Sequence, residues 1–141
     1  MNMATIKFKL ESDMTAEILK AKEEQVLLGL HAIGQEAEGY AKGNCPVDTG
    51  MLRNSITYAV TGEGPATQRY SSDDGSRRGS YSGSVPKDDV PVVYIGTNVE
   101  YAEDVEFNDM RHRTGKAHFL RDAATTHSDR YKDIMEAALK A

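Results

Sequence analysis

The sequence predicts an α+β fold, in which a small antiparallel sheet carries a long N-terminal helix, a short middle helix and a C-terminal helix packed on one face. Some short segments alternate apolar and polar residues, as strands do, and two long segments repeat apolar residues every three or four positions, as helices do. The chain has 141 residues. This length suits one hydrophobic core, so we expect a single domain over residues 1–141.

The first part of the chain is predicted to contain a strand and a long helix. Residues 5–10 alternate apolar and polar side chains, which is the period of a half-buried strand. From about residue 15 to residue 42 the apolar residues form one helical stripe. Gly43 follows this stripe and Pro46 comes soon after it, and both residues are typical of the end of a helix.

Five further elements are predicted after this helix. Residues 49–53 have the pattern of a short helical turn, and residues 55–61 alternate as a second strand. Residues 90–96 are almost continuously apolar, which predicts a strand buried on both faces. Residues 97–100 have the spacing of a capping box, which is expected to open a short helix that continues to about residue 107. The last helix begins near residue 119, and its apolar stripe continues as far as residue 138.

The segment from residue 62 to residue 89 differs from the rest of the chain. It is rich in glycine, serine and charged residues and has no apolar period, so it is predicted to be a long loop or extended hairpin tip without a core of its own. Because strand-like segments flank it, we expect it to link two neighbouring strands. The residues in it that we expect to contact a partner are Arg69, Tyr70, Arg77, Arg78, Tyr81 and Lys87.

Composition excludes several classes of function. The formal charge of −5 argues against a dedicated nucleic-acid binder, and no apolar run is long enough to span a bilayer. The N-terminus lacks the apolar region of a signal peptide, so we expect a protein that is made and retained in a cytoplasm. Cys45 is the single cysteine, and neither it nor the four histidines have the spacing of a metal or cofactor site.

The triplet Asp48-Thr49-Gly50 allows an enzymatic alternative. Dimeric aspartic proteases present their catalytic carboxylate in the same triplet and share one proton between two such groups. In those enzymes an apolar strand leads into the triplet, whereas here the helix-ending residues 42–46 precede it. A cap followed by a turn is therefore the favoured interpretation of Asp48, and no catalytic residue is assigned.

The 62–89 segment allows a second alternative, a nucleic-acid-binding module. Interleaved arginine and tyrosine side chains can contact a phosphate backbone and stack on bases. However, five acidic residues offset four basic residues in this segment. A flexible solvated loop is also compatible with the composition, but we favour a segment that becomes ordered against a partner subunit.

Charge also separates along the chain between residues 100 and 121. The acidic block contains no base and consists of Glu100, Glu103, Asp104, Glu106 and Asp109. The basic block follows at once and consists of Arg111, Arg113, Lys116 and Arg121. If the two blocks lie on different sides of the domain, one copy can dock head-to-tail on the next and the contact can close into a ring. Pairing of the blocks within one subunit is equally compatible with the sequence.

Three strings in a fixed order resemble the tail-completion and head–tail joining proteins of long-tailed bacteriophages. They are Pro-Val-Asp-Thr-Gly-Met-Leu-Arg-Asn-Ser-Ile at 46–56, Val-Tyr-Ile-Gly-Thr-Asn-Val-Glu-Tyr-Ala at 93–102 running into Val-Glu-Phe at 105–107, and His-Phe-Leu-Arg-Asp-Ala at 118–123. The resemblance covers about residues 15 to 139. The sequence departs from the family pattern in two places: Asn108-Asp109 follow Phe107 where Gly-Thr is expected, and His118 stands before Phe119 where a proline is expected.

This resemblance implies an α+β subunit of a ring, typically sixfold, in the neck or at the head-proximal end of the tail. It implies connector or adaptor proteins and tail proteins as partners, no catalysis and no cofactor. Genome DNA could pass through such a ring, but no specific nucleic-acid binding is implied. The protein would belong to the virion and assemble in the bacterial host cytoplasm. A tail terminator or a head-closure protein is the alternative within the same class.

The resemblance also implies architectural roles for individual residues. One group would fix the turn after the long helix: Asp48, Thr49, Gly50, Leu52 and Arg53. A second group would fix the short helix: Tyr101, Ala102, Glu106 and Phe107. Phe119 and Leu120 would anchor the last helix.

Overall fold

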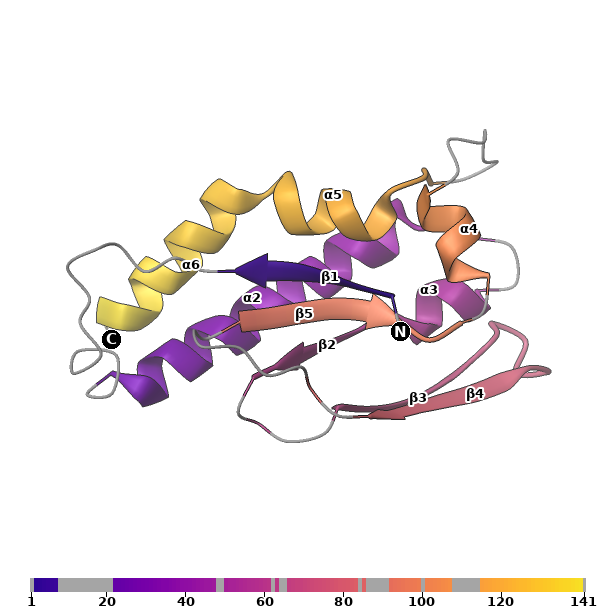
Figure 1. Ribbon diagram of the computed structural model, residues 1–141, viewed down its shortest axis with the longest axis horizontal. Helices are drawn as coiled ribbons and strands as arrows, with labels where there is room; N and C mark the ends of the chain where they lie inside the picture. Colours follow the sequence, from indigo (N-terminus) through magenta and orange to yellow (C-terminus); the bar gives the residue numbers. More distant parts are fainter. Residues whose placement is uncertain are drawn as a thin grey trace.

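The central sheet has three antiparallel strands in the order β1-β5-β2 (Figure 1). The computed structural model describes residues 2–7, 22–47, 50–61, 63, 66–83, 85, 92–99, 101–107 and 115–140. Strand β1 (Asn2–Lys7) and strand β2 (Thr57–Val60) flank strand β5 (Val92–Thr97). Every residue of β5 is buried, which confirms the predicted burial on both faces. The first strand begins earlier than predicted, and residues 8–10 lie outside the described residues.

Helix α2 (Glu23–Asn44) forms the long helix of the fold. It continues to Asn44, so Gly43, which was expected just past its end, lies inside the helix. Cys45 takes the predicted extended conformation before Pro46. The predicted start near residue 15 lies outside the described part of the chain. One face of α2 is buried against β2 and β5, and at Gly34 the ring of Tyr58 occupies the space that a Cβ atom would fill. The absent side chain therefore permits close contact between α2 and the sheet.

The C-terminal segment forms two helices where the sequence predicts one. Helix α5 (Phe119–Thr125) and helix α6 (Ser128–Lys140) are separated by a short turn. The residues from Thr125 to Ser128 have low helix propensity, and the Thr125 hydroxyl donates a hydrogen bond of 2.9 Å to the carbonyl of Arg121, a contact that bends helices. The turn places His127 parallel to Tyr40 of α2, with ring centroids 3.6 Å apart.

The hydrophobic core lies between the sheet and the helices α2, α5 and α6. Its side chains come from Leu30 and Ile33 of α2, from Val93 and Ile95 of β5, and from Phe119 of α5, all fully buried. Figure 1 shows α2 and α6 running along the same side of the molecule. The fold is therefore α+β, with helices packed on the sheet as predicted. Among the described residues, no helix has the length and apolar character needed to cross a membrane.

Two short helices complete the fold. Helix α3 (Met51–Ser55) lies between α2 and β2, and helix α4 (Ala102–Phe107) follows β5. Both correspond to helical segments that the sequence predicts. In α3, Met51 and Leu52 are buried, and Ser55 bonds to Thr97 of β5 at 2.5 Å between hydroxyl oxygens.

Of the two predictions for 62–89, a long loop or an extended hairpin tip, the described residues agree with the hairpin. Strand β3 (Ala66–Ser71) and strand β4 (Arg78–Gly83) pair as an antiparallel hairpin that forms a separate two-stranded sheet. The segment joins β2 and β5, which pair with each other, so the expectation that it links neighbouring strands is confirmed. An isolated hairpin is marginally stable in water, and this one therefore depends on its contacts with the body of the protein.

Candidate assembly surface

The hairpin is fastened to α3 by a polar cluster around its tip. Arg53 of α3 forms an ion pair of 2.6 Å with Asp73, and the Asn54 amide donates to Asp73 at 3.0 Å and to the carbonyl of Ser71 at 2.8 Å. Gly50, which precedes α3, has φ +82°, and the Asp73 carboxylate occupies the space where its Cβ would lie. Gly50 and Arg53, which the resemblance implies in the turn, thus contact the hairpin.

A second connection fastens β4 to the end of β5. The Tyr70 hydroxyl donates a hydrogen bond of 2.5 Å to the Asn98 side-chain oxygen, and the Asn98 amide donates to the carbonyl of Ser80 at 3.0 Å. On the other strand, the side-chain amide of Asn54 donates to the carbonyl of Ser71 in β3. The backbone carbonyl of Asn54 also accepts a hydrogen bond of 3.4 Å from the side-chain amide of Gln68. Each outer edge of the hairpin is therefore capped by one asparagine side chain, which restricts pairing with a further strand.

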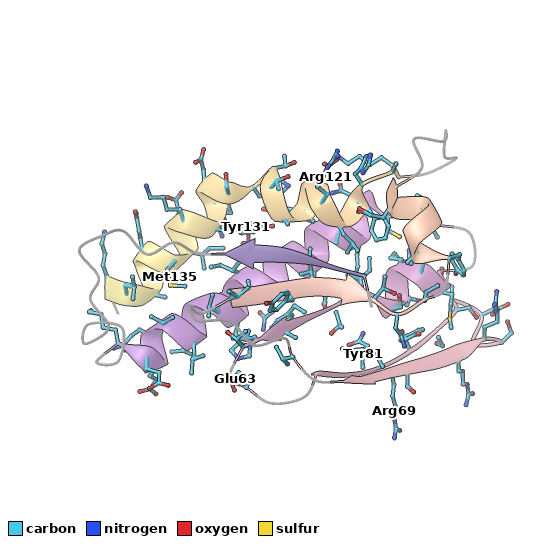
Figure 2. All side chains as sticks on the ribbon, viewed as in Figure 1. Glu63, Arg69, Tyr81, Arg121, Tyr131 and Met135 are labelled. Carbon is cyan, nitrogen blue, oxygen red and sulfur yellow. The ribbon has the colours of Figure 1, made fainter. Side chains whose placement is uncertain are left out.

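The hairpin register separates its side chains into an inner and an outer face. Tyr70 pairs with Gly79, and the Tyr70 ring fills the space beside that glycine on the inner face. Figure 2 shows Tyr81 directed toward the body of the molecule and Arg69 directed away from it. Because side chains alternate along a strand, the outer face carries the other cross-strand pairs. These are Arg69 with Ser80 and Ser71 with Arg78.

The outer face is an open basic surface. Its residues Arg69, Ser71, Arg78 and Ser80 line an open concavity of about 680 Å³ together with Tyr70, Gly75 and Gly79. Arg69, Arg77 and Arg78 are exposed, and in the described part of the chain none of the three forms an ion pair with a carboxylate.

The carboxylates of the hairpin are engaged elsewhere. Asp73 is bound by Arg53. Asp74 accepts hydrogen bonds from the Ser72 hydroxyl and from the amide and hydroxyl of Ser76, and these bonds lower the pKa of Asp74 to about 2. Asp74 thus stays ionised and closes the turn at the hairpin tip. The positive charge of the arginines is therefore not neutralised by direct ion pairs within the hairpin.

Gly50→Ala is expected to lower the free energy of unfolding by about 3 kcal/mol, because the new Cβ combines a strained backbone with a clash against Asp73. Gly75→Ala is the matched control. Gly75 has a similar φ of +75° but no atom within 4 Å of its Cβ position, so we expect a loss of only about 1 kcal/mol. Urea unfolding measures both values, and equal losses would show that the Asp73 contact is unimportant.

A second joint connects α4 to α5. Glu106 is only 4% exposed, and its carboxylate Oε1 accepts hydrogen bonds from the backbone amides of Leu120 at 2.7 Å and Arg121 at 3.2 Å. The amide of His118 donates to the Glu106 carbonyl at 2.8 Å. The Glu106 side chain therefore caps the N-terminus of α5 from a separate helix. His118 has φ 57°, a conformation that proline cannot adopt.

Burial raises the pKa of Glu106 above its ordinary value of 4.5, although the Arg121 and Leu120 amides favour the ionised form. A raised pKa means that the folded state holds this proton more tightly than the unfolded state does. Protonation of Glu106 therefore adds to the free energy of unfolding. This contribution is fully present below pH 4.5 and is lost as the pH rises through the raised pKa.

Comparison with Glu106→Gln is expected to reveal this titration, because the variant cannot lose a proton. The free energy of unfolding of the wild type, minus that of the variant, should fall as the pH rises from about 4.5 and then become constant. Urea unfolding across this pH range measures the difference. A difference that did not change with pH would rule out the raised pKa.

The structure also revises the interpretation of the charge blocks at 100–121. Glu106 is not a surface charge, because it is buried in the α4–α5 joint. Lys116 and Arg121 both pair with Asp122 of the same subunit, at 3.0 and 3.2 Å. Part of the basic block is therefore paired internally. The other members of both blocks lie outside the described residues, or have side chains that the structure does not describe.

The remaining residues of the predicted motif divide into three groups. Buried in the core are Leu52, Ala102, Phe119 and Leu120. Tyr101 is 38% exposed. Asp48, Thr49, Lys87 and the side chain of Phe107 lie outside what the structure describes. Asn54, Asp73 and Asn98, which hold the hairpin, were not singled out from the sequence, because isolated polar residues carry no periodic signal.

The described residues hold neither a cluster of metal-ligating side chains nor an exposed cysteine. They contain no group of three or more His, Cys, Asp or Glu side chains that could hold a metal ion. Cys45 is buried, and this burial raises the pKa of its thiol to about 12, so the thiolate nucleophile is suppressed. Near Asp48, the segments on either side are the end of α2 and the helix α3. This differs from the strand that leads into the aspartic-protease triplet.

Comparison with models of known protein families gives a match to a bacteriophage family. Residues 4–107 match the model of the HK97-gp10-like family, which is described as "Bacteriophage HK97-gp10, putative tail-component". No curated protein and no solved structure matches the chain. The matched region includes most of β1, the strands β2 and β5, the helices α2, α3 and α4, and the hairpin. Because the match covers more than half of the 141 residues, the chain belongs to the HK97-gp10-like family of bacteriophage tail components.

Proposed function

We propose that this protein forms a closed homo-oligomeric ring, with sixfold symmetry, at the head-proximal end of the phage tail. There it completes the tail and joins it to the head. Its partners are the connector or adaptor proteins on the head side and tail proteins on the other side. The subunit acts by shape and contact without catalysis, and the ring assembles in the cytoplasm of the bacterial host.

The anchored hairpin is the observation that carries this proposal. None of its described residues belongs to the hydrophobic core cluster, yet Arg53, Asn54 and Asn98 hold it in a defined position. A polar element that is fixed but contributes nothing to the core is suited to contact another subunit. In a tail component, identical contacts repeated around an axis would give a collar more stable than any single contact.

Electron microscopy of lysates from a phage that lacks this gene tests the proposal. DNA-filled heads beside separate tails of normal length would support a role in completing the tail and joining it to the head. Tails of abnormal length would instead favour a tail terminator. Heads that have lost their DNA would favour a head-closure protein. Normal infectious particles would contradict every structural role.

A matched complementation experiment connects this phenotype to the hairpin. A plasmid copy lacking residues 66–83 should fail to restore plaques, whereas the full-length gene should restore them. Circular dichroism and thermal unfolding of the shortened protein would establish that its body still folds. Restoration of normal virions by a folded shortened protein would contradict a role for the hairpin in assembly.

A further inference from the structure

We propose that the outer face of the β3–β4 hairpin binds the acidic segment 100–109 of a second copy of this chain. The contact would be head-to-tail, with the arginines of one subunit on the carboxylates of the next. This inference rests on the proposed ring and names the two surfaces that would close it.

The position of the hairpin leaves its outer face as the available surface. Asn54 and Asn98 occupy carbonyl groups on the two outer edges, at Ser71 and Ser80. The inner face is turned toward the body, where the Tyr70 hydroxyl bonds to Asn98. The outer face is directed away from the subunit that carries it, as Arg69 shows in Figure 2. A partner of this face must therefore come from another molecule.

The charges on this face define the chemistry of the partner. Arg69 and Arg78 on this face, and Arg77 in the adjoining turn, are exposed and have no described carboxylate paired to them, in a chain whose formal charge is −5. Guanidinium groups bind carboxylates through two parallel hydrogen bonds, and the adjacent hydroxyls of Ser71 and Ser80 add further donors. A carboxylate-rich surface would satisfy these groups.

The segment 100–109 supplies such carboxylates. Apart from the buried Glu106, it contains Glu100, Glu103, Asp104 and Asp109, and it contains no lysine or arginine. The inward side of α4 is defined by Ala102, Val105 and Glu106, which pack in the core or its margin.

Duplex DNA is the competing ligand for a basic surface. Three arginines would neutralise few phosphates, and the net negative charge of the subunit would repel the duplex over longer distances. The charge pattern therefore favours a protein carboxylate partner over a phosphate backbone.

Charge reversal on each side of the contact tests the inference in the full-length protein. Arg69→Glu with Arg78→Glu should raise the dissociation constant of the oligomer at least a hundredfold, because it places like charges opposite each other. Glu103→Arg with Asp104→Arg should weaken assembly in the same way. The four substitutions combined should restore much of the oligomer, because the charges are then exchanged. Mass photometry over a dilution series measures each distribution.

Two controls make the result specific. Lys132→Glu with Lys140→Glu changes the net charge by the same amount as the arginine reversal, at exposed positions of α6. This control should leave the oligomer unchanged. Circular dichroism and thermal unfolding of every variant exclude misfolding as the cause. Added salt should weaken the wild-type oligomer, because it screens exposed ion pairs.

The possible outcomes separate this inference from the proposed function. If the wild type forms an oligomer and both reversal variants form it equally well, the hairpin contact is overturned, while the proposal of a ring still stands. If each reversal abolishes the oligomer and the combined variant does not restore it, the pairing with segment 100–109 is overturned. A wild-type protein that stays monomeric at the highest concentration would contradict both proposals. Salt-sensitive binding of duplex DNA, abolished by the arginine reversal while the oligomer persists, would identify a phosphate ligand instead.

Discussion

Phe119→Ala is expected to lower the free energy of unfolding by about 3–5 kcal/mol, which would be among the largest single-residue effects in this protein. Phe119 is the first residue of α5, its side chain is fully buried, and it belongs to the core cluster between the sheet and α2. Truncation removes its apolar contacts and leaves a cavity that the surrounding elements can only partly fill. Urea unfolding followed by far-ultraviolet circular dichroism measures the loss.

Phe119→Leu is the matched control, because it keeps a large apolar side chain in the same space. We expect it to retain most of the stability that Phe119→Ala loses. A loss below about 1 kcal/mol for Phe119→Ala would mean that α5 is not anchored through this residue.

Glu106→Ala is expected to lower the free energy of unfolding by about 2–3 kcal/mol, because the amides of Leu120 and Arg121 lose their acceptor at the joint between α4 and α5. The destabilisation should be concentrated in α5. In the Glu106→Ala variant, hydrogen exchange should therefore accelerate more at the amides of α5 than at those of α2, relative to the wild type. Urea unfolding and hydrogen exchange together measure both effects.

Glu106→Gln separates the role of the acceptor from that of the charge. The glutamine oxygen can still accept both amide hydrogen bonds, so this variant should remain within about 1 kcal/mol of the wild type near neutral pH. If the Ala and Gln variants were equally destabilised, the cap on α5 would not be the source of the effect.

The parts of the fold that the sequence predicts are those whose residues repeat with a regular period. The apolar stripe of α2 and the continuous apolar run of β5 identify these elements because both are buried against a common core. The pairing of β2 with β5 was expected from the strand-like flanks of the intervening segment. The stop of α2 before Pro46 follows from local backbone chemistry alone.

The hairpin could not be predicted in the same way. Strands β3 and β4 consist mainly of serine, glycine, threonine, arginine and tyrosine, and they bury no apolar face in the core. Their position depends on side-chain amides from Asn54 and Asn98, which are distant in sequence. Tertiary contacts of this kind leave no period in the sequence.

Two further features could not be predicted from periodicity: the division of the C-terminal helix into α5 and α6, and the burial of Glu106. The apolar stripe continues through His127, so a period-based prediction joins α5 and α6 across the turn that the intervening residues form. Glu106 lies in an acidic stretch that resembles a solvated surface, whereas the fold uses its carboxylate as a cap for α5. Only the family resemblance gave Glu106 an architectural role before the structure placed it.

Quantitative mass spectrometry of gradient-purified virions tests the central claim, that this chain is a structural component of the phage tail, most directly. The account predicts that the protein is present at a small fixed number of copies relative to the major capsid protein, and that it stays with the tail or the head–tail joint when particles are dissociated. Absence from purified infectious virions, with the protein abundant in the lysate, would contradict the account.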